Sequence, residues 1–85
     1  MDEASLLEVV TELIQRLGVD LRRERLGGDG GNLCRIRGKN VLFDDLDSDI
    51  ATRVDRCISA LADLPEAASI YMPPEIRERV EKYRT

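Results

Sequence analysis

The chain contains no histidine, no tryptophan, three other aromatic residues and two cysteines. Without histidine it cannot carry a Ser-His-Asp triad, a Cys-His dyad or an H-E-x-x-H zinc site. Two cysteines cannot supply a zinc site with four cysteines, or one with two cysteines and two histidines. Since no catalytic or metal motif is complete, we expect a non-enzymatic protein with no catalytic residues, no metal ligands and no cofactor.

Long hydrophobic runs are also lacking, and the uncharged apolar stretches fall far short of the roughly 20 residues that span a bilayer. The first ten residues are acidic where a signal peptide would carry a basic region. We therefore expect a cytoplasmic protein with reduced thiols and no membrane partner.

The composition that remains is that of a globular domain, with 42% hydrophobic and 35% charged residues among 85. This length fits a single domain over residues 1–85. A domain of this size buries only about 60–65% of its extended-chain surface, so its stability is marginal. Association with a second copy would be a natural remedy.

Three stretches carry hydrophobic residues at helical spacing. They cover residues 3–17, about 48–63 with Ser48 as the N-cap, and about 74–84 with Pro74 in the first turn. The residues expected on their buried stripes are Leu6, Val10, Leu13, Ile14 and Leu17, then Ile50, Val54, Cys57, Ile58, Leu61 and Leu64, and finally Ile76, Val80 and Tyr83.

The remaining chain reads as strands. Residues 19–26 alternate, and a glycine-rich break separates them from 33–37 and 40–44. The last two stretches fit a hairpin around Gly38-Lys39, because glycine in the first central position suits a type II′ turn. The predicted fold class is α+β, with a three-stranded antiparallel sheet and helices on one face. Residues 69–72 fit a further short strand beside this sheet.

The Gly38-Lys39 turn would place Arg37 opposite Asn40 and so sort the hairpin into two faces. The face expected to be buried carries Cys34, Ile36, Val41 and Phe43. The face expected to be exposed carries Arg35, Arg37, Asn40 and Leu42.

Two motifs resemble ligand sites but are incomplete. Asp45, Asp47 and Asp49 stand at positions 1, 3 and 5 of an EF-hand loop. Ile50 stands where that loop requires glycine, and Arg56 where it requires glutamate. We interpret these acids as charges at the positive end of a helix. The glycines before residue 32 do not lead from a strand into a helix, which favours a flexible connection over a phosphate loop.

Charge is unevenly distributed along the chain, whose net charge is −4. Residues 18–40 hold three acids and six bases, whereas residues 41–66 hold seven acids and two bases. The sheet is therefore expected to be basic and two of the helices acidic. The candidate interaction surface comprises Arg35, Arg37, Lys39, Asn40 and Leu42, with Arg22 nearby.

Three functions remain open. The first is self-association as a homodimer, or binding of a protein partner, through this surface. The second is a binding module for an anionic ligand or nucleic acid; the pI near 4.8 argues against nucleic acid as a partner. The third is an enzyme that uses Cys34 or the carboxylates of 44–49. Both cysteines fall on faces expected to be buried, which favours unreactive thiols.

Residues 31–44, Gly-Asn-Leu-Cys-Arg-Ile-Arg-Gly-Lys-Asn-Val-Leu-Phe-Asp, and 71–77, Tyr-Met-Pro-Pro-Glu-Ile-Arg, resemble a group of small, uncharacterised bacterial proteins. This resemblance implies a bacterial cytosolic protein and no particular activity. The helix–hairpin–helix order is similar to that of the zinc peptidases that cleave phage repressors and stress regulators. Their helix after the hairpin carries H-E-x-x-H, whereas this chain has Cys57-Ile58-Ser59-Ala60-Leu61. The resemblance implies a shared scaffold and no catalytic role.

The incomplete motifs lead to a first prediction. Calorimetric titration with Ca²⁺ or Zn²⁺ should show no tight binding, because the acidic run lacks its glycine and its bidentate glutamate and the thiols are too few. Stoichiometric zinc retained through purification would contradict this and indicate a site shared between two chains through Cys34 and Cys57.

Overall fold

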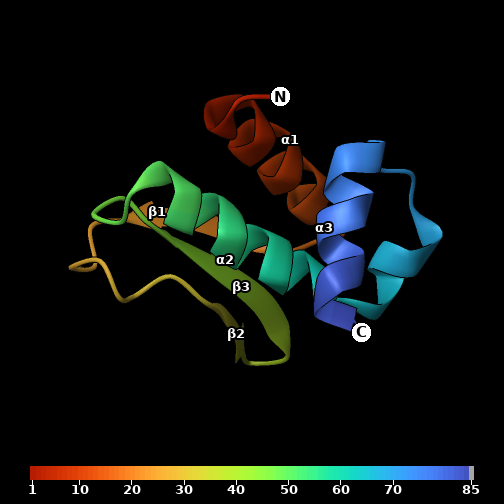
Figure 1. The fold of residues 1–85 in the computed structure, drawn as a ribbon. Coiled ribbons are helices and arrows are strands. Elements are labelled where there is room, and N and C mark those ends of the chain that lie inside the picture. Colours follow the sequence, from red (N-terminus) through yellow and green to blue (C-terminus); the bar gives the residue numbers. More distant parts are fainter. Residues whose placement is uncertain (85) are drawn as a thin grey trace.

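The computed structural model describes residues 1–84, in which helices lie on one side of a small sheet (Figure 1). The chain is α+β, as the sequence predicts. The elements in order are α1 (Glu3–Arg16), β1 (Asp20–Glu24), β2 (Leu33–Ile36), β3 (Lys39–Asp45), α2 (Ile50–Ala62), the 3-10 helix η1 (Pro65–Ser69) and α3 (Pro74–Arg84).

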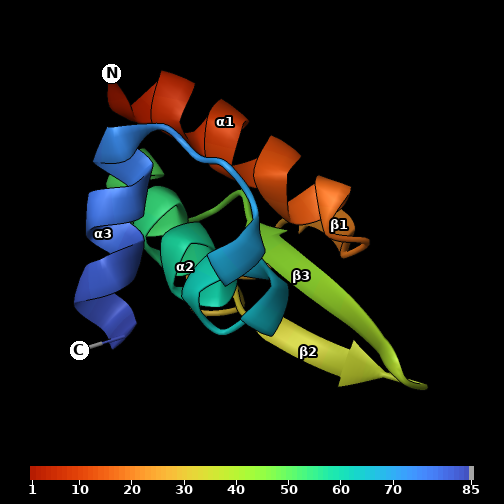
Figure 2. The ribbon, with the colours of Figure 1, turned by 90° about the vertical axis from the view of Figure 1, so that its right-hand side faces the viewer.

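The sheet is mixed, so the prediction of an antiparallel sheet is wrong. Its order is β1-β3-β2, with β3 in the middle, parallel to β1 and antiparallel to β2. The loop after β1 crosses the end of the middle strand and delivers β2 to the far side of the sheet. The β2–β3 hairpin then projects beyond the helices (Figure 2). Strand alternation carries no information about this crossing, because it is the same for parallel and antiparallel partners.

The hairpin turn lies one residue earlier than the sequence predicts. Arg37 and Gly38 occupy it with φ of 52° and 79°, which is the left-handed pair of a type I′ turn. Ile36 therefore lies opposite Lys39, and Cys34 opposite Val41. The predicted pairing of Arg37 with Asn40 is wrong. Each residue of β2 faces a β3 residue two positions earlier than predicted, so the sorting into two faces survives.

The choice of buried face is wrong in part, since Val41 is buried as predicted, with 2% of its surface exposed. Leu42, predicted to be exposed, has no exposed surface and joins the core, whereas Ile36 is 42% exposed. The reason is the neighbour that the parallel pairing supplies, because Leu21 of β1 lies beside Leu42 and Leu33 of β2 lies opposite it. A leucine row thus crosses all three strands and meets the helices.

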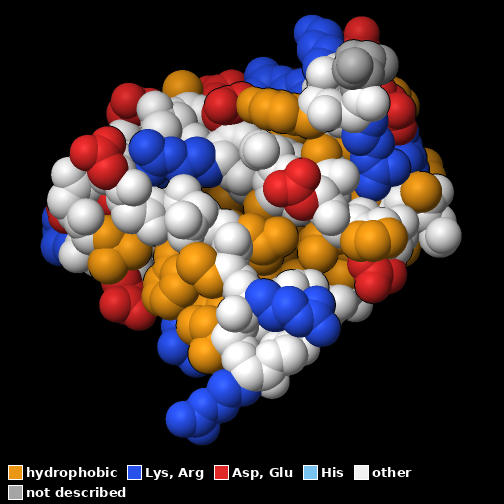
Figure 3. Space-filling view, turned by 90° about the horizontal axis from the view of Figure 1, so that it is seen from below, with side chains coloured by type: hydrophobic (Ala, Val, Ile, Leu, Met, Phe, Trp, Pro, Cys, Tyr) orange, Lys and Arg blue, Asp and Glu red, His pale blue; other side chains and the backbone are white. Residues whose placement is uncertain are grey.

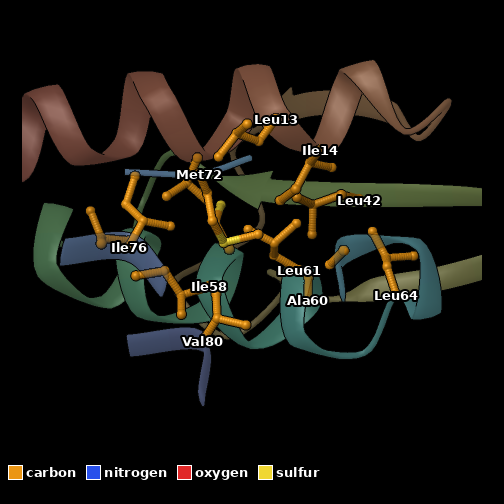
Figure 4. Packing of buried hydrophobic residues seen from close by; sticks show 14 of the residues in the cluster. Leu13, Ile14, Leu42, Ile58, Ala60, Leu61, Leu64, Met72, Ile76 and Val80 are labelled. Atoms are coloured by element: carbon orange, nitrogen blue, oxygen red, sulfur yellow. The ribbon is translucent and has the colours of Figure 1, made fainter. Parts of the chain in front are cut away.

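Helices α1 and α2 pack on the sheet, and α3 packs on α2. Their facing side chains fill one core (Figure 4). The predicted stripes are confirmed by the buried residues Leu6, Val10, Leu13, Ile14, Val54, Cys57, Ile58, Leu61, Leu64, Ile76 and Val80. Two of the predicted core residues, Ile50 and Tyr83, are instead exposed by 40% and 46%.

Two further local predictions are corrected. The N-cap of α2 is Asp49, whose carboxylate accepts a hydrogen bond from the Thr52 backbone N–H at 2.8 Å, and not Ser48. Residues 69–72 form no strand, because Ser69 closes η1 and the following residues run outside the sheet. The buried Met72 anchors this segment to the core instead.

The core leads to a stability prediction. Leu61→Ala and Leu13→Ala should each lower the free energy of unfolding by about 2–5 kcal/mol, because both side chains are buried and leave a cavity. Chemical denaturation followed by circular dichroism measures this. Ile50→Ala, on the same helix as Leu61 but exposed, is the matched control and should cost less than about 1 kcal/mol. Equal effects of Ile50→Ala and Leu61→Ala would contradict the packing described.

Candidate functional site

The carboxylate of Asp45 organises the end of the sheet. This side chain is 1% exposed and sits where the β1–β2 loop crosses β3. Its Oδ1 accepts hydrogen bonds from the backbone N–H groups of Leu26 and Asp47, each at 2.9 Å. Its Oδ2 accepts from Gly28 at 2.7 Å and Gly30 at 3.0 Å. Gly28 has a φ of 99°, a backbone conformation that favours glycine, so this loop uses its glycines to wrap an anion.

The same contacts keep Asp45 ionised. Burial alone would raise its pKa, but the four backbone hydrogen bonds outweigh burial and lower the pKa from 3.8 to about 2. For these glycines the sequence favours a flexible connection over a phosphate loop. The structure shows a loop whose N–H groups already bind an anion of the chain itself.

Asp44 points to the opposite face of β3 and holds α2. The Arg53 guanidinium donates to both carboxylate oxygens, at 2.8 and 2.7 Å, and Arg23 adds a hydrogen bond at 3.2 Å. Burial opposes ionisation, but Arg53 and then Arg23 together lower the pKa of Asp44 below 3.8. Asp47 binds the Gly27 N–H, and Asp49 caps α2. Each carboxylate of the acidic run therefore has a partner within the fold.

The two thiols occupy different environments. Cys57 is buried in α2, and burial followed by the charge of Asp44 raises its pKa to about 12. It therefore stays protonated at neutral pH and is a poor nucleophile. Cys34 is half-buried on the face of the sheet away from the helices, where its thiol donates to the Asn32 side chain at 3.2 Å.

One edge of the sheet is open along β2. The Phe43 N–H donates to the Asn32 carbonyl at 2.9 Å, which makes this opposed pair a hydrogen-bonded pair of the antiparallel ladder. The alternation then directs the backbone groups of Cys34 and Ile36 to β3, and those of Leu33 and Arg35 away from it. Within residues 1–84, nothing bonds to the Leu33 and Arg35 backbone groups.

A groove of about 280 Å³ lies between the start of β2 and α2. Figure 3 looks from the side of the β2 edge and shows hydrophobic side chains in the middle of this surface, with single charged side chains around them. The acidic residues Asp55 and Asp63 line the groove together with Arg56. Arg56 donates to the Ser48 hydroxyl at 2.9 Å, and Asp55 accepts a hydrogen bond from the Tyr83 hydroxyl.

The predicted interaction residues are only partly brought together. Arg35, Arg37 and Lys39 are exposed around the hairpin turn, and the half-buried Asn40 lies opposite Arg35. Within the described chain, residues 1–84, these three bases form no ion pair and no side-chain hydrogen bond.

Two of the predicted residues lie elsewhere. Arg22 is on β1, the opposite edge strand, where it pairs with Asp20 at 3.1 Å. Leu42 is in the core and reaches no surface. The acids of the groove and the open edge itself were missed, because both depend on which strand lies at the edge beside α2. The sequence signals the hairpin but carries no signal for that strand order.

None of the helices in residues 1–84 is both long and apolar enough to cross a bilayer. No protein-family model matches the sequence, and no curated protein or solved structure matches it either. The similarity to the scaffold of the zinc peptidases therefore stays a prediction, and the function has to be inferred from the geometry of this chain.

The Asp45 contacts lead to a pH prediction. Because the folded-state pKa of about 2 lies below the ordinary 3.8, Asp45 stabilises the fold above pH 3.8, and this contribution is lost as the pH falls toward 2. Asp45→Asn should lower stability at neutral pH, since its NH₂ group would face backbone N–H donors. It should also make stability depend less on pH below 3.8, because the titrating carboxyl group is gone. Denaturation between pH 2 and 7 measures both effects. Asp29→Asn, which removes an exposed carboxylate of the same loop and none of the four hydrogen bonds to Asp45, is the control and should change stability at neutral pH by less than about 0.5 kcal/mol.

Proposed function

We propose that this chain is a non-enzymatic protein-binding module whose β2 edge receives an extended segment of another polypeptide. The observation that carries this proposal is the pair of outward-facing N–H and C=O groups at Leu33 and Arg35. An edge with unpaired backbone groups is a template for a further strand, and such strand addition is a recurrent mode of peptide recognition.

Side chains beside the edge support a bound strand. Ile36 is 42% exposed and Leu33 and Cys34 are half-buried, so the edge carries apolar surface that a partner would cover. The groove on the helix side of β2 offers room for side chains of the added strand. The exposed Arg35 contributes the apolar-plus-arginine composition that is enriched at the core of interfaces.

A pair of substitutions at one position tests this proposal. Arg35→Pro removes the outward N–H without touching a bond to β3, whereas Arg35→Ala removes the charge and keeps the N–H. Short peptides selected from a random display library on the wild-type chain should bind the alanine variant. They should bind the proline variant at least about tenfold more weakly. The proline ring removes one backbone hydrogen bond to the peptide and occupies the place of the N–H group. Calorimetry measures the affinities.

The outcome against the proposal is a set of peptides that bind both variants equally. Hydrogen exchange of the backbone amides is a second measurement that needs no variant. The Leu33 and Arg35 amides should exchange rapidly in the free chain and slow down when peptide binds, whereas the Cys34 and Ile36 amides should be protected throughout. Protection of all four amides in the free monomer would contradict the open edge.

A second candidate function is binding of an anionic ligand at the hairpin turn. It is favoured by the absence, within residues 1–84, of any ion-pair partner for Arg35, Arg37 and Lys39. Heparin is a suitable probe, since binding to these bases would weaken steeply with salt. The same Arg35→Pro and Arg35→Ala pair separates the candidates, because both variants lose the charge and would lose the anion equally.

A further inference from the structure

The sheet has two edges, and only one of them is unguarded. Strand β1 presents the charged side chains of Arg22, Arg23 and Glu24, a common protection against pairing with another chain. Strand β2 carries Leu33, Cys34 and Ile36, with Arg35 as its single charge. A strand added to this sheet would therefore pair with β2.

We infer that the segment received by the β2 edge is the β2 strand of a second copy of this chain, paired antiparallel about Cys34. This inference rests on the proposed use of that edge and names its occupant. The pairing would place Cys34 opposite Cys34 of the second copy, and Leu33 opposite Arg35 of the second copy.

The register follows from the ladder. The outward groups of Leu33 and Arg35 must form the new bonds, and opposed residues must share a face. Two registers satisfy both conditions and overlap the strands by three residues. One places Arg35 opposite its own equivalent, where like charges repel. The other register places Leu33 opposite Arg35 of the second copy. This second register is favoured, because it avoids that repulsion.

Charge complementarity supports this register. Leu33 lies on the helix side of the sheet and lines the groove that also contains Asp55 and Asp63. A side chain opposite Leu33 shares that side, so Arg35 of the second copy would lie at a groove lined by two acidic residues. The groove also holds the charge of Arg56, which is turned to the Ser48 hydroxyl.

Two-fold symmetry doubles every contact, since each copy offers Arg35 and receives it. The two chains would form one continuous six-stranded sheet with the helices on the same side. The pairing also buries part of Ile36 and Cys34 on the other face. Because the strands are short, the dimer is expected to be weak and to dissociate on dilution.

The first experiment measures association and register on the whole chain. Sedimentation equilibrium should show a monomer–dimer equilibrium with a dissociation constant below about 1 mM. Oxidation by copper-phenanthroline should convert two opposed Cys34 thiols into one disulfide, the copper complex taking two electrons and solvent two protons. Their Cα atoms in a non-hydrogen-bonded pair are about 4.5 Å apart, which a disulfide can bridge. Arg35→Pro, which keeps Cys34, controls for chance collisions and should form the covalent dimer far more slowly.

A charge reversal and its rescue test the groove. Arg35→Glu should weaken dimerisation about tenfold, because it places two new repulsive contacts against the groove acids. Combining it with Asp63→Arg should restore the dimer, which a purely structural role of either residue would not do. Arg22→Glu, the same change on the opposite edge strand, should leave the association unchanged.

The outcomes separate this inference from the proposed function. A chain that stays monomeric at about 1 mM overturns self-pairing, and if selected peptides still bind the edge, the proposed function stands. A dimer without the Cys34 disulfide, or without rescue by Asp63→Arg, overturns the register and the groove contact. A monomeric chain whose edge also binds no selected peptide overturns both proposals.

Discussion

The Asp45 carboxylate is the interaction on which the arrangement of the sheet depends. The loop after β1 must cross the end of the middle strand, and a crossing loop has backbone N–H groups that need partners. Three of them, from Leu26, Gly28 and Gly30, converge on this one buried side chain together with the N–H of Asp47. These four hydrogen bonds stabilise the charged form of Asp45 and hold its pKa low. The loop is thereby held on its path, and β2 arrives on the far side of β3.

The neighbouring Asp44 does the corresponding work on the other face. Adjacent residues of a strand point to opposite sides, so two consecutive acids can serve two different parts of the fold. Asp44 binds Arg53 of α2 and fixes the helix over the sheet, while Asp45 fixes the loop. The acidic run that resembles a calcium loop is a set of structural anchors, each with its own partner.

These two anchors together shape the surface that we propose as a binding site. With the loop held, β2 becomes an edge strand, and with α2 held, the acids Asp55 and Asp63 line a groove beside it. Leu33 of the hairpin and the acids Asp55 and Asp63 belong to different stretches of the chain, and the fold brings them together along one groove. An edge that offers backbone groups, apolar side chains and charges of both signs suits a polypeptide better than a small polar ligand.

The helices and the α+β class could be predicted from the sequence, because periodicity reports local conformation. Leu13, Leu61 and Val80 fall on stripes at helical spacing, and such stripes are buried in almost any packing that the chain could adopt. The hairpin was predictable for the same reason, and so was the sorting of Cys34 and Leu42 onto opposite faces, since alternation survives a shift of two residues.

Only the tertiary structure decided which of those faces packs against the helices, which strand lies in the middle and which edge stays open. Leu42 is buried because Leu21, a residue far away in the sequence, lies beside it in a parallel pair. Asp45 anchors the β1–β2 loop because the path of this loop brings its backbone N–H groups to the Asp45 carboxylate. The open groups of Leu33 and Arg35 exist because no fourth strand within residues 1–84 pairs with β2, a fact about neighbours in space that local pattern does not encode. The sequence by itself determines what each segment can form, and the contacts between segments determine what is left for a partner to bind.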